Sequence, residues 1–191
     1  MTGEFRLIIY AKTKRFAPPV YDLFKCQRYP QRRNRIKSGV SPLGNHEYYK
    51  GAYPKTLYKI KDAASNSNIH ELENESLKID HVCFHGCTLW TDFSLKGNPA
   101  AYEALCQSRM NDYKKIRLGD NYAKLRSIDT FRIHQTSRQW LEHSLSVNQA
   151  KHNIVVTHHA PSIQSLPMKY LDDPISAKCG KINRLNYCTL L

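Results

Sequence analysis

The sequence contains no run of about twenty apolar residues, the length that a membrane-spanning helix needs. Residues 5–10 form a short apolar patch, but the patch is too short for a secretory signal and its flanks are wrong for one. The six cysteines do not follow the spacing of a disulfide framework, and no internal repeat is present. We therefore expect a cytoplasmic protein that has no membrane partner.

Acidic residues are scarce at the two ends of the chain. Residues 1–42 hold ten Lys and Arg against two acids, and residues 178–191 hold three against none. Residues 43–177 are nearly balanced, with sixteen against fourteen, so most of the net charge of +13 lies in the terminal segments. A length of 191 residues fits one domain. We expect a basic, poorly ordered segment over 1–42, a domain over 43–177 and a basic tail over 178–191.

The middle segment alternates between helical and strand patterns. Helices are predicted over residues 53–64 and 98–113, and a further helix is capped by Asp129 or Thr136. That last helix places Trp140, Leu141 and Leu145 on an inward stripe. Strands are predicted over residues 69–72, 77–79, 82–90 and 154–156. Strands that alternate with helices favour an α/β layered fold.

One turn carries a neutral oxygen ligand, an imidazole and a carboxylate in consecutive positions, in the motif Gly44-Asn45-His46-Glu47. The glycine permits a sharp turn at the end of a strand. The asparagine carbonyl can bind a hard divalent cation without adding charge, and the histidine can hold or deliver a proton near neutral pH. The alternative is a structural turn with a capping Asn and a solvated His.

A second motif lies far downstream. Residues 154–156, Ile-Val-Val, are typical of a strand buried on both faces, and they lead directly into Thr157-His158-His159-Ala160-Pro161. Open α/β sheets place their catalytic ligands at the carboxyl ends of such strands. The two motifs together therefore indicate a metal-assisted phosphate ester hydrolase.

With these motifs the chain resembles the calcineurin-like metallophosphoesterases, and in particular a bacterial subgroup. Residues 86–93, Gly-Cys-Thr-Leu-Trp-Thr-Asp-Phe, and residues 110–113, Met-Asn-Asp-Tyr, also resemble that subgroup in the expected order. The resemblance spans residues 43–177. It implies part of a two-sheet sandwich flanked by helices.

The resemblance also implies roles for individual residues. Intact members bind two divalent cations, Mn²⁺, Fe²⁺ or Zn²⁺, at which a phosphate mono- or diester is hydrolysed. By position, Asn45 and His158 are metal ligands, and His46 stabilises or protonates the leaving oxygen. In the family Glu47 mostly supports a metal ligand or holds the backbone, and His159 would replace His158 as the ligand if the register differed by one residue. Asp92 contacts the substrate or a metal ligand, or else it caps its loop. Four other histidines, expected at the surface or in satisfied contacts, show no partner pattern: His70, His134, His143 and His152.

Three motifs of the family are absent from the sequence: Asp-x-His, Gly-Asp-x-x-Asp and Gly-His-x-His. The chain therefore offers two recognisable ligands for one metal ion and none for the other. Catalytic metal sites generally use three protein ligands. We expect at most one weakly bound ion, and hydrolysis of a generic phosphodiester at no more than the background rate.

The basic ends allow two interpretations. In the first, both ends are translated out of the ancestral reading frame, so that the gene is a disrupted phosphoesterase. In the second, the N-terminal segment is an arm for binding. The corresponding alternative function is a basic nucleic-acid-binding protein on an inactive phosphoesterase core. Its contacts would be non-specific and would use Arg28, Arg32, Arg33, Arg35 and Lys37.

Overall fold

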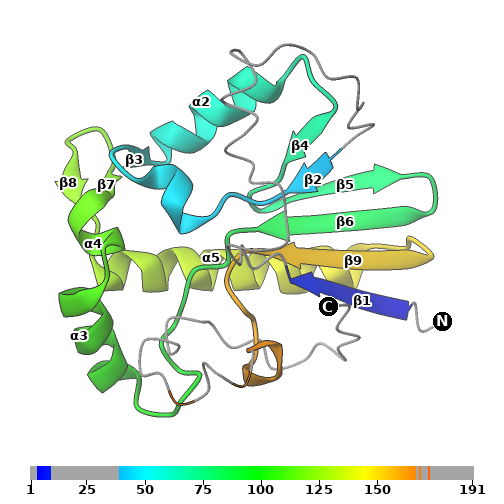
Figure 1. The fold of residues 1–191 in the computed structure, drawn as a ribbon. Coiled ribbons are helices and arrows are strands. Elements are labelled where there is room, and N and C mark those ends of the chain that lie inside the picture. The colour runs from blue at the N-terminus through cyan, green and yellow to red at the C-terminus, as the bar shows by residue number, and fades with distance from the viewer. Residues whose placement is uncertain (1–3, 10–38, 167, 169–171, 173–191) are drawn as a thin grey trace.

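The computed structural model describes residues 4–9, 39–166, 168 and 172. Helices and strands alternate along these residues, as Figure 1 shows, and the predicted α/β class is confirmed. The strands form three sheets of four, two and three strands. The two-sheet sandwich that the resemblance implies stays a prediction.

The largest sheet has the strand order β1-β9-β6-β5 (Figure 1). Its members are β1 (Glu4–Ile9), β9 (His152–Thr157), β6 (Val82–Cys87) and β5 (Glu75–Ile79). β1, β9 and β6 are parallel, whereas β5 and β6 form an antiparallel hairpin. Because β9 has a parallel neighbour on each side, its apolar sequence is that of a central strand.

The sequence analysis missed β1. We expected residues 1–42 to be poorly ordered, but within that segment Glu4–Ile9 pairs with β9 over six residue positions and Gly39–Ser41 forms a further strand. The two strands are separated by more than 140 residues along the chain, so their pairing leaves no local signal. Residues 10–38, which include the arginines of the nucleic-acid alternative, lie outside the described residues, as does the tail over 178–191.

Two smaller sheets stand beside the main one. β2 (Gly39–Ser41) pairs in parallel with β4 (Ile69–Glu71). The third sheet has the order β3-β7-β8 and is made of three short strands: β3 (Ala52–Tyr53), β7 (Arg117–Leu118) and β8 (Ala123–Lys124).

β6 ends at Cys87, three residues earlier than predicted. Leu89 and Trp90 adopt φ angles of 70° and 50°, and Phe93 adopts 60°. A strand cannot continue through left-handed backbone, which L-residues with large side chains rarely adopt. The predicted strand over residues 82–90 is therefore a strand followed by a tight, strained loop.

Two predicted helices are confirmed with shifted ends. α2 (Lys55–Ala64) begins just after Pro54. α3 (Pro99–Arg109) has the expected Asn98 cap, whose side chain accepts a hydrogen bond from the Ala101 amide at 3.3 Å. The prediction ran to residue 113, but Met110 is extended and a separate short helix, α4 (Asp112–Lys115), follows.

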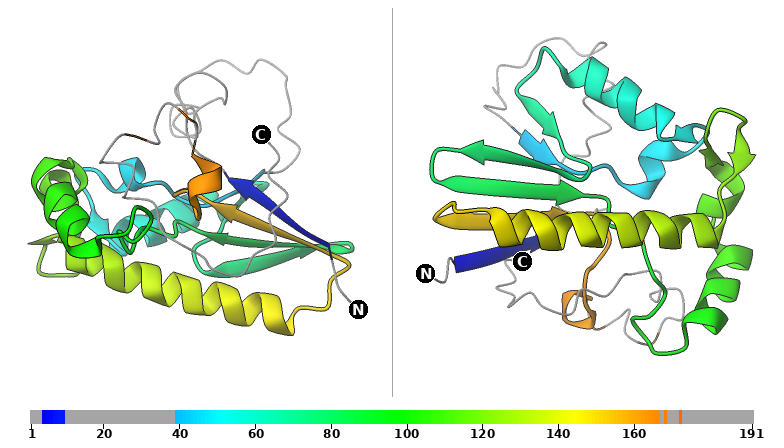
Figure 2. Two further views of the ribbon diagram at one scale, coloured as in Figure 1. Left: turned by 90° about the horizontal axis from the view of Figure 1, so that it is seen from below. Right: turned by 180° about the vertical axis from the view of Figure 1, so that it is seen from behind.

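The longest helix, α5 (Ser127–Val147), covers one face of the main sheet, as Figure 2 shows. Asp129 does not occupy the N-cap position that we predicted, but it lies in the first turn and accepts a hydrogen bond from the Arg126 amide at 2.9 Å. Thr136 lies inside the helix, where its hydroxyl donates to the Arg132 carbonyl, so it is not a cap. The inward stripe is confirmed, because Leu141 is buried and both Trp140 and Leu145 pack against its cluster.

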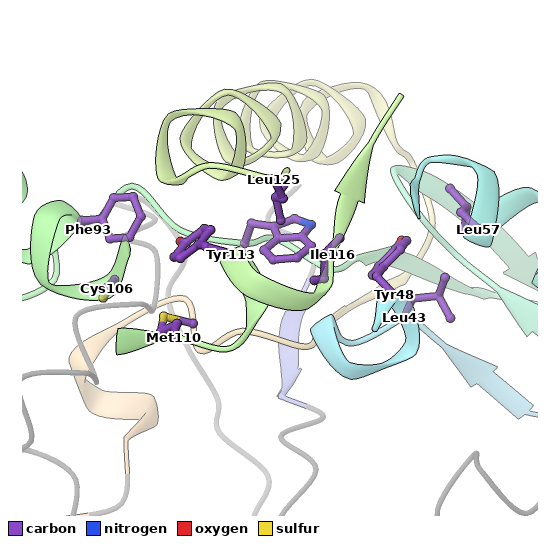
Figure 3. Packing of buried hydrophobic residues seen from close by; sticks show 10 residues of the cluster. Leu43, Tyr48, Leu57, Phe93, Cys106, Met110, Tyr113, Ile116 and Leu125 are labelled. Atoms are coloured by element: carbon purple, nitrogen blue, oxygen red, sulfur yellow. The ribbon is translucent and has the colours of Figure 1, made fainter. Parts of the chain in front are cut away.

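The main core lies beneath the turn that carries the first motif. Figure 3 shows Leu43 and Tyr48, which flank that turn, together with side chains from α2, α3 and α4. A smaller cluster joins α5 to the sheet through Leu141, Cys87, Leu89 and Val155. Within the described residues, no helix has the length and apolar character needed to cross a bilayer.

The contact between α5 and the sheet can be tested with Leu141→Ala. We expect a loss of about 2–5 kcal/mol in the free energy of unfolding, because the substitution leaves a cavity in a close-packed cluster. Urea denaturation measures the loss. Val147→Ala in the same helix is the control, because Val147 is 60% exposed and its truncation should have little effect. Equal stability of the two variants would contradict this packing.

Candidate metal centre

The candidate site is built where β6 and β9 end together. Their parallel register pairs Cys87 with Thr157, the last residue of each strand. Thr88 and His158 are therefore the first residues after two neighbouring strands. The His159 amide donates to the Thr88 carbonyl at 3.2 Å, which extends the pairing one step past the strands. The sheet thus fixes the backbone that carries His158 and His159.

The Gly44 turn lies directly against His158. A short 3₁₀ helix, Asn45–Tyr48, follows Gly44, and the Glu47 carboxylate accepts a hydrogen bond from the Gly44 amide at 2.9 Å. A methyl group on Gly44 would lie 2.5 Å from Cε1 of His158 and 2.7 Å from the Glu47 carboxylate. Glycine therefore allows the turn to approach these two side chains without displacing them. Glu47 thus holds the backbone of its own turn.

The structure brings Asn45 and His158 together. The Asn45 Oδ1 atom lies 3.0 Å from Nε2 of His158, although the two residues are 113 positions apart in the sequence. Asn45 is 7% exposed, and His158 is partly exposed. The pair therefore combines a buried amide oxygen with an imidazole that solvent can reach.

Asp112 holds the other end of the Asn45 amide. Its Oδ1 atom accepts a hydrogen bond from Asn45 Nδ2 at 2.8 Å and a second from the Tyr49 hydroxyl at 2.6 Å. The sequence analysis assigned no role to Asp112 or Tyr49. The available signal was the Met-Asn-Asp-Tyr motif at residues 110–113, which we used only for the resemblance.

His46 is exposed and follows Asn45 in the turn. Its ring lies 4.7 Å, centre to centre, from the ring of Tyr49. The Tyr49 hydroxyl donates a hydrogen bond to Asp112, which in turn accepts one from the Asn45 amide. His46 is therefore linked to the Asn45 amide through Tyr49 and Asp112. The exposed imidazole can exchange protons with solvent.

His159 does not share the contacts of His158. It is buried, its Nδ1 atom lies 3.1 Å from the Thr88 carbonyl oxygen, and its ring stacks on Trp90 with 5.5 Å between centres. The two neighbouring rings contact each other edge to face, with 5.0 Å between their centres, but they have different hydrogen-bond partners. Of the two histidines, His158 is the one beside Asn45.

Asp92 lies in the strained loop after β6 and caps it. Its carboxylate accepts hydrogen bonds from the Ser94 amide at 3.0 Å and from the Ser94 hydroxyl at 2.7 Å. One of its oxygens lies 3.8 Å from Nε2 of His134. His134 is fully buried, and its Nδ1 lies 2.9 Å from the Leu89 carbonyl oxygen. His134 is therefore not a surface residue but a support for this loop.

The Asn45 oxygen and the His158 nitrogen are atoms of the kinds that can bind a divalent cation. Amide oxygen and imidazole nitrogen are both accepted ligands of Mn²⁺ or Zn²⁺, and here they lie one hydrogen-bond length apart. Throughout the ranges that the structure describes, no three His, Cys, Asp or Glu side chains form a group suited to a metal ion. Asn45 and His158 would thus supply two ligands at most, fewer than a catalytic site generally uses.

A buried pair of carboxyl groups lies behind the turn. The Glu73 Oε2 atom accepts a hydrogen bond from the Thr88 amide at 2.8 Å. Burial, together with the nearby Glu73 and Glu47 carboxylates, raises the pKa of Glu71 to about 9. Burial likewise raises the pKa of Glu73 to about 7, against the hydrogen bonds from Thr88. Near neutral pH Glu71 is therefore protonated.

Two surface pockets lie elsewhere. One, of about 410 Å³, is lined by residues of α2, β4 and β5, and the other, of about 430 Å³, is lined mainly by residues around β8. Neither is lined by Asn45, His158 or Asp112.

Comparison with known proteins adds one relative. The chain is similar to the uncharacterized protein L509 of Acanthamoeba polyphaga mimivirus, with 32% identity over 127 residues. The match covers 62% of this chain and 43% of that protein, so the chain spans less than half the length of its relative. No family model matches the chain. No solved structure matches it either.

The close approach of Gly44 to His158 can be tested with Gly44→Ala. The φ of −97° is allowed for alanine, so the effect would come from the crowding of His158 and Glu47 alone. We expect a loss of about 1–3 kcal/mol in unfolding free energy, measured by urea denaturation. Gly39→Ala is the control, because a methyl group there meets nothing within 4 Å. Equal effects at both positions would contradict the close approach.

Because the pKa of Glu71 is raised on folding, we expect the free energy of unfolding to fall as the pH rises. The pKa is raised on folding from its ordinary value of 4.5 to about 9, so the stabilisation is complete below pH 4.5 and is lost as the pH rises to 9. Glu71→Gln should remove this loss. Its stability relative to the wild type should rise by about 1.4 kcal/mol per pH unit within that window.

Unfolding free energies at pH 5.5, 7 and 8.5 measure the effect. Glu142→Gln is the control, because the Glu142 side chain is half exposed and pairs with Arg138 at the surface. A pH-independent difference between Glu71→Gln and the wild type would show that Glu71 is ionised in the folded protein.

Proposed function

We propose that this chain carries one metal-binding half of a metallophosphoesterase-type site, in which Asn45 and His158 bind a single divalent cation. One observation carries the proposal: the Asn45 amide oxygen lies 3.0 Å from His158 Nε2, with the amide nitrogen held on the opposite side by Asp112. Both residues come from motifs that resemble calcineurin-like metallophosphoesterases. Two turns that are far apart in the sequence thus bring an amide oxygen, which suits a hard cation, next to an imidazole nitrogen.

A structural hydrogen bond alone explains less of this arrangement. Asn45 is buried, whereas His158 is partly exposed, so the contact could exchange its proton for an ion from solvent. The Gly44 turn is also packed so closely on His158 that a larger residue would force the His158 or Glu47 side chain to move. A bond needed only for stability would not call for an exposed imidazole at the end of a central strand.

The residues divide the proposed chemistry as follows. A divalent cation, when bound, would polarise a phosphate ester P–O bond and make bound water more acidic. Asn45 and His158 would hold the cation, and Glu47 fixes the turn by its bond to the Gly44 amide. His46, exposed beside the pair, would supply a proton to the leaving oxygen. The substrate class is a phosphate mono- or diester.

We propose further that the chain is a degenerate member of this type. The three absent motifs leave two ligands, so binding of Mn²⁺ should be weak and hydrolysis should not exceed background. The alternative of nucleic-acid binding rests on Arg28, Arg32 and their neighbours, which lie outside the described residues. No contact among the residues that the structure describes favours that alternative.

Titration of the purified full-length chain with Mn²⁺, followed by electron paramagnetic resonance, tests the proposed function. We expect weak binding to one site, and we expect Asn45→Ala and His158→Ala each to weaken it by about tenfold or more, because each removes half of the ligand pair. His143→Ala, which removes an exposed histidine on α5, should leave the affinity unchanged.

The same samples are assayed for metal-dependent hydrolysis of bis(p-nitrophenyl) phosphate. Mn²⁺ affinity that is equal in the wild type, Asn45→Ala and His158→Ala would contradict the site. Strong turnover that is lost in His158→Ala would support the site but overturn the prediction that the chain is degenerate.

A further inference from the structure

Asp112 is a buried carboxylate whose position the proposed metal binding does not yet explain. It is 1% exposed, and its Oδ2 atom has no hydrogen-bond partner among the described residues. Burying a carboxylate without full compensation costs free energy. An apolar residue at this position would avoid that cost, so the carboxyl group serves some other purpose in the structure.

The hydrogen bonds of Asp112 define which way the Asn45 amide faces. Asp112 Oδ1 accepts a hydrogen bond from the Asn45 amide nitrogen at 2.8 Å, so the nitrogen side of this amide faces Asp112. The amide oxygen is then on the side of His158. The Tyr49 hydroxyl donates to the same Asp112 oxygen and helps to hold the carboxylate in place.

The reverse orientation would be unfavourable. Rotating the Asn45 amide by 180° would place its oxygen against the Asp112 carboxylate, where two acceptors would face each other without a proton. It would also present a nitrogen without a lone pair to His158. Such an amide could not bind a cation beside His158, because its ligand atom is the carbonyl oxygen.

We propose that Asp112 is the positioning residue for the site: it selects the orientation of the Asn45 amide that presents the oxygen, rather than the nitrogen, beside His158 Nε2. The effect on metal affinity rests on the proposed function. The orientation itself does not, because it is a property of the metal-free protein. In that state Nε2 of His158 must carry the hydrogen that bonds to the Asn45 oxygen.

The first test measures the metal-free wild-type protein. Nitrogen-15 NMR of the histidine ring nitrogens shows which of them carries a hydrogen. We expect a hydrogen on Nε2 of His158, and we expect slowed exchange of the Asn45 side-chain amide. A His158 ring without hydrogen on Nε2 would overturn the proposal without the need for any variant.

The second test uses Asp112→Asn, which keeps the shape of the side chain but offers both a donor and an acceptor. The Asn45 amide is then free to rotate, so the population with hydrogen on His158 Nε2 should fall. Mn²⁺ affinity should fall by about tenfold to a hundredfold, as is usual for residues that support a metal ligand. Asp129→Asn, at a buried aspartate that holds the start of α5, is the matched control.

The exchange variant Asn45→Asp/Asp112→Asn separates positioning from mere stability. It keeps the net charge and lets an amide nitrogen at position 112 donate to a carboxylate at position 45. Mn²⁺ affinity should recover to at least the wild-type value. An exchange variant that binds Mn²⁺ no better than Asp112→Asn would overturn the proposal, and so would an Asp112→Asn protein with wild-type His158 resonances and affinity.

The two proposals fail in different ways. If the wild-type protein binds no Mn²⁺, the proposed function is wrong, and the NMR comparison of wild type with Asp112→Asn still decides the role of Asp112. Thermal unfolding of each variant, followed by circular dichroism, establishes that the compared proteins are folded.

Discussion

The parallel register between β6 and β9 is the constraint on which the site depends. It ends the two strands at paired residues, Cys87 and Thr157, and the main-chain bond from His159 to Thr88 continues the alignment. The strained backbone at Leu89 and Trp90 then turns the chain away from the sheet. The space at the carboxyl ends of these strands is occupied by the Gly44 turn, which packs against His158.

A chain of hydrogen bonds lies at the carboxyl ends of these strands and runs from Asp112 through the Asn45 amide to His158. Each group fixes the next, because a carboxylate can only accept, an amide has one donor side and one acceptor side, and an imidazole nitrogen takes the remaining role. Its two inner members are buried, where a polar group that lacks a partner is costly. The outer member is open to solvent, which is where an ion would enter.

The sequence predicted the local features of the fold well. Helices α2 and α3, the inward stripe of α5 and the central strand β9 follow from periodicity and caps. Features that depend on residues far apart in the sequence were not predicted. β1 pairs with a strand more than 140 residues away, and the hydrogen bond between Asn45 and Asp112 joins residues 67 positions apart. The early end of β6 was missed because left-handed φ at Leu89 has no signature in residue type. Asn45 and His158 were found from motifs, whereas Asp112, which holds Asn45, was not.

The most direct test of the central claim is a crystal structure of the full chain soaked in Mn²⁺, with anomalous scattering recorded at a wavelength that locates manganese. The account predicts an anomalous peak in contact with the Asn45 Oδ1 and His158 Nε2 atoms, with the Asn45 amide nitrogen still bonded to Asp112. A well-ordered map with Asn45 and His158 in place and no peak between them, or a peak bound elsewhere, would contradict it.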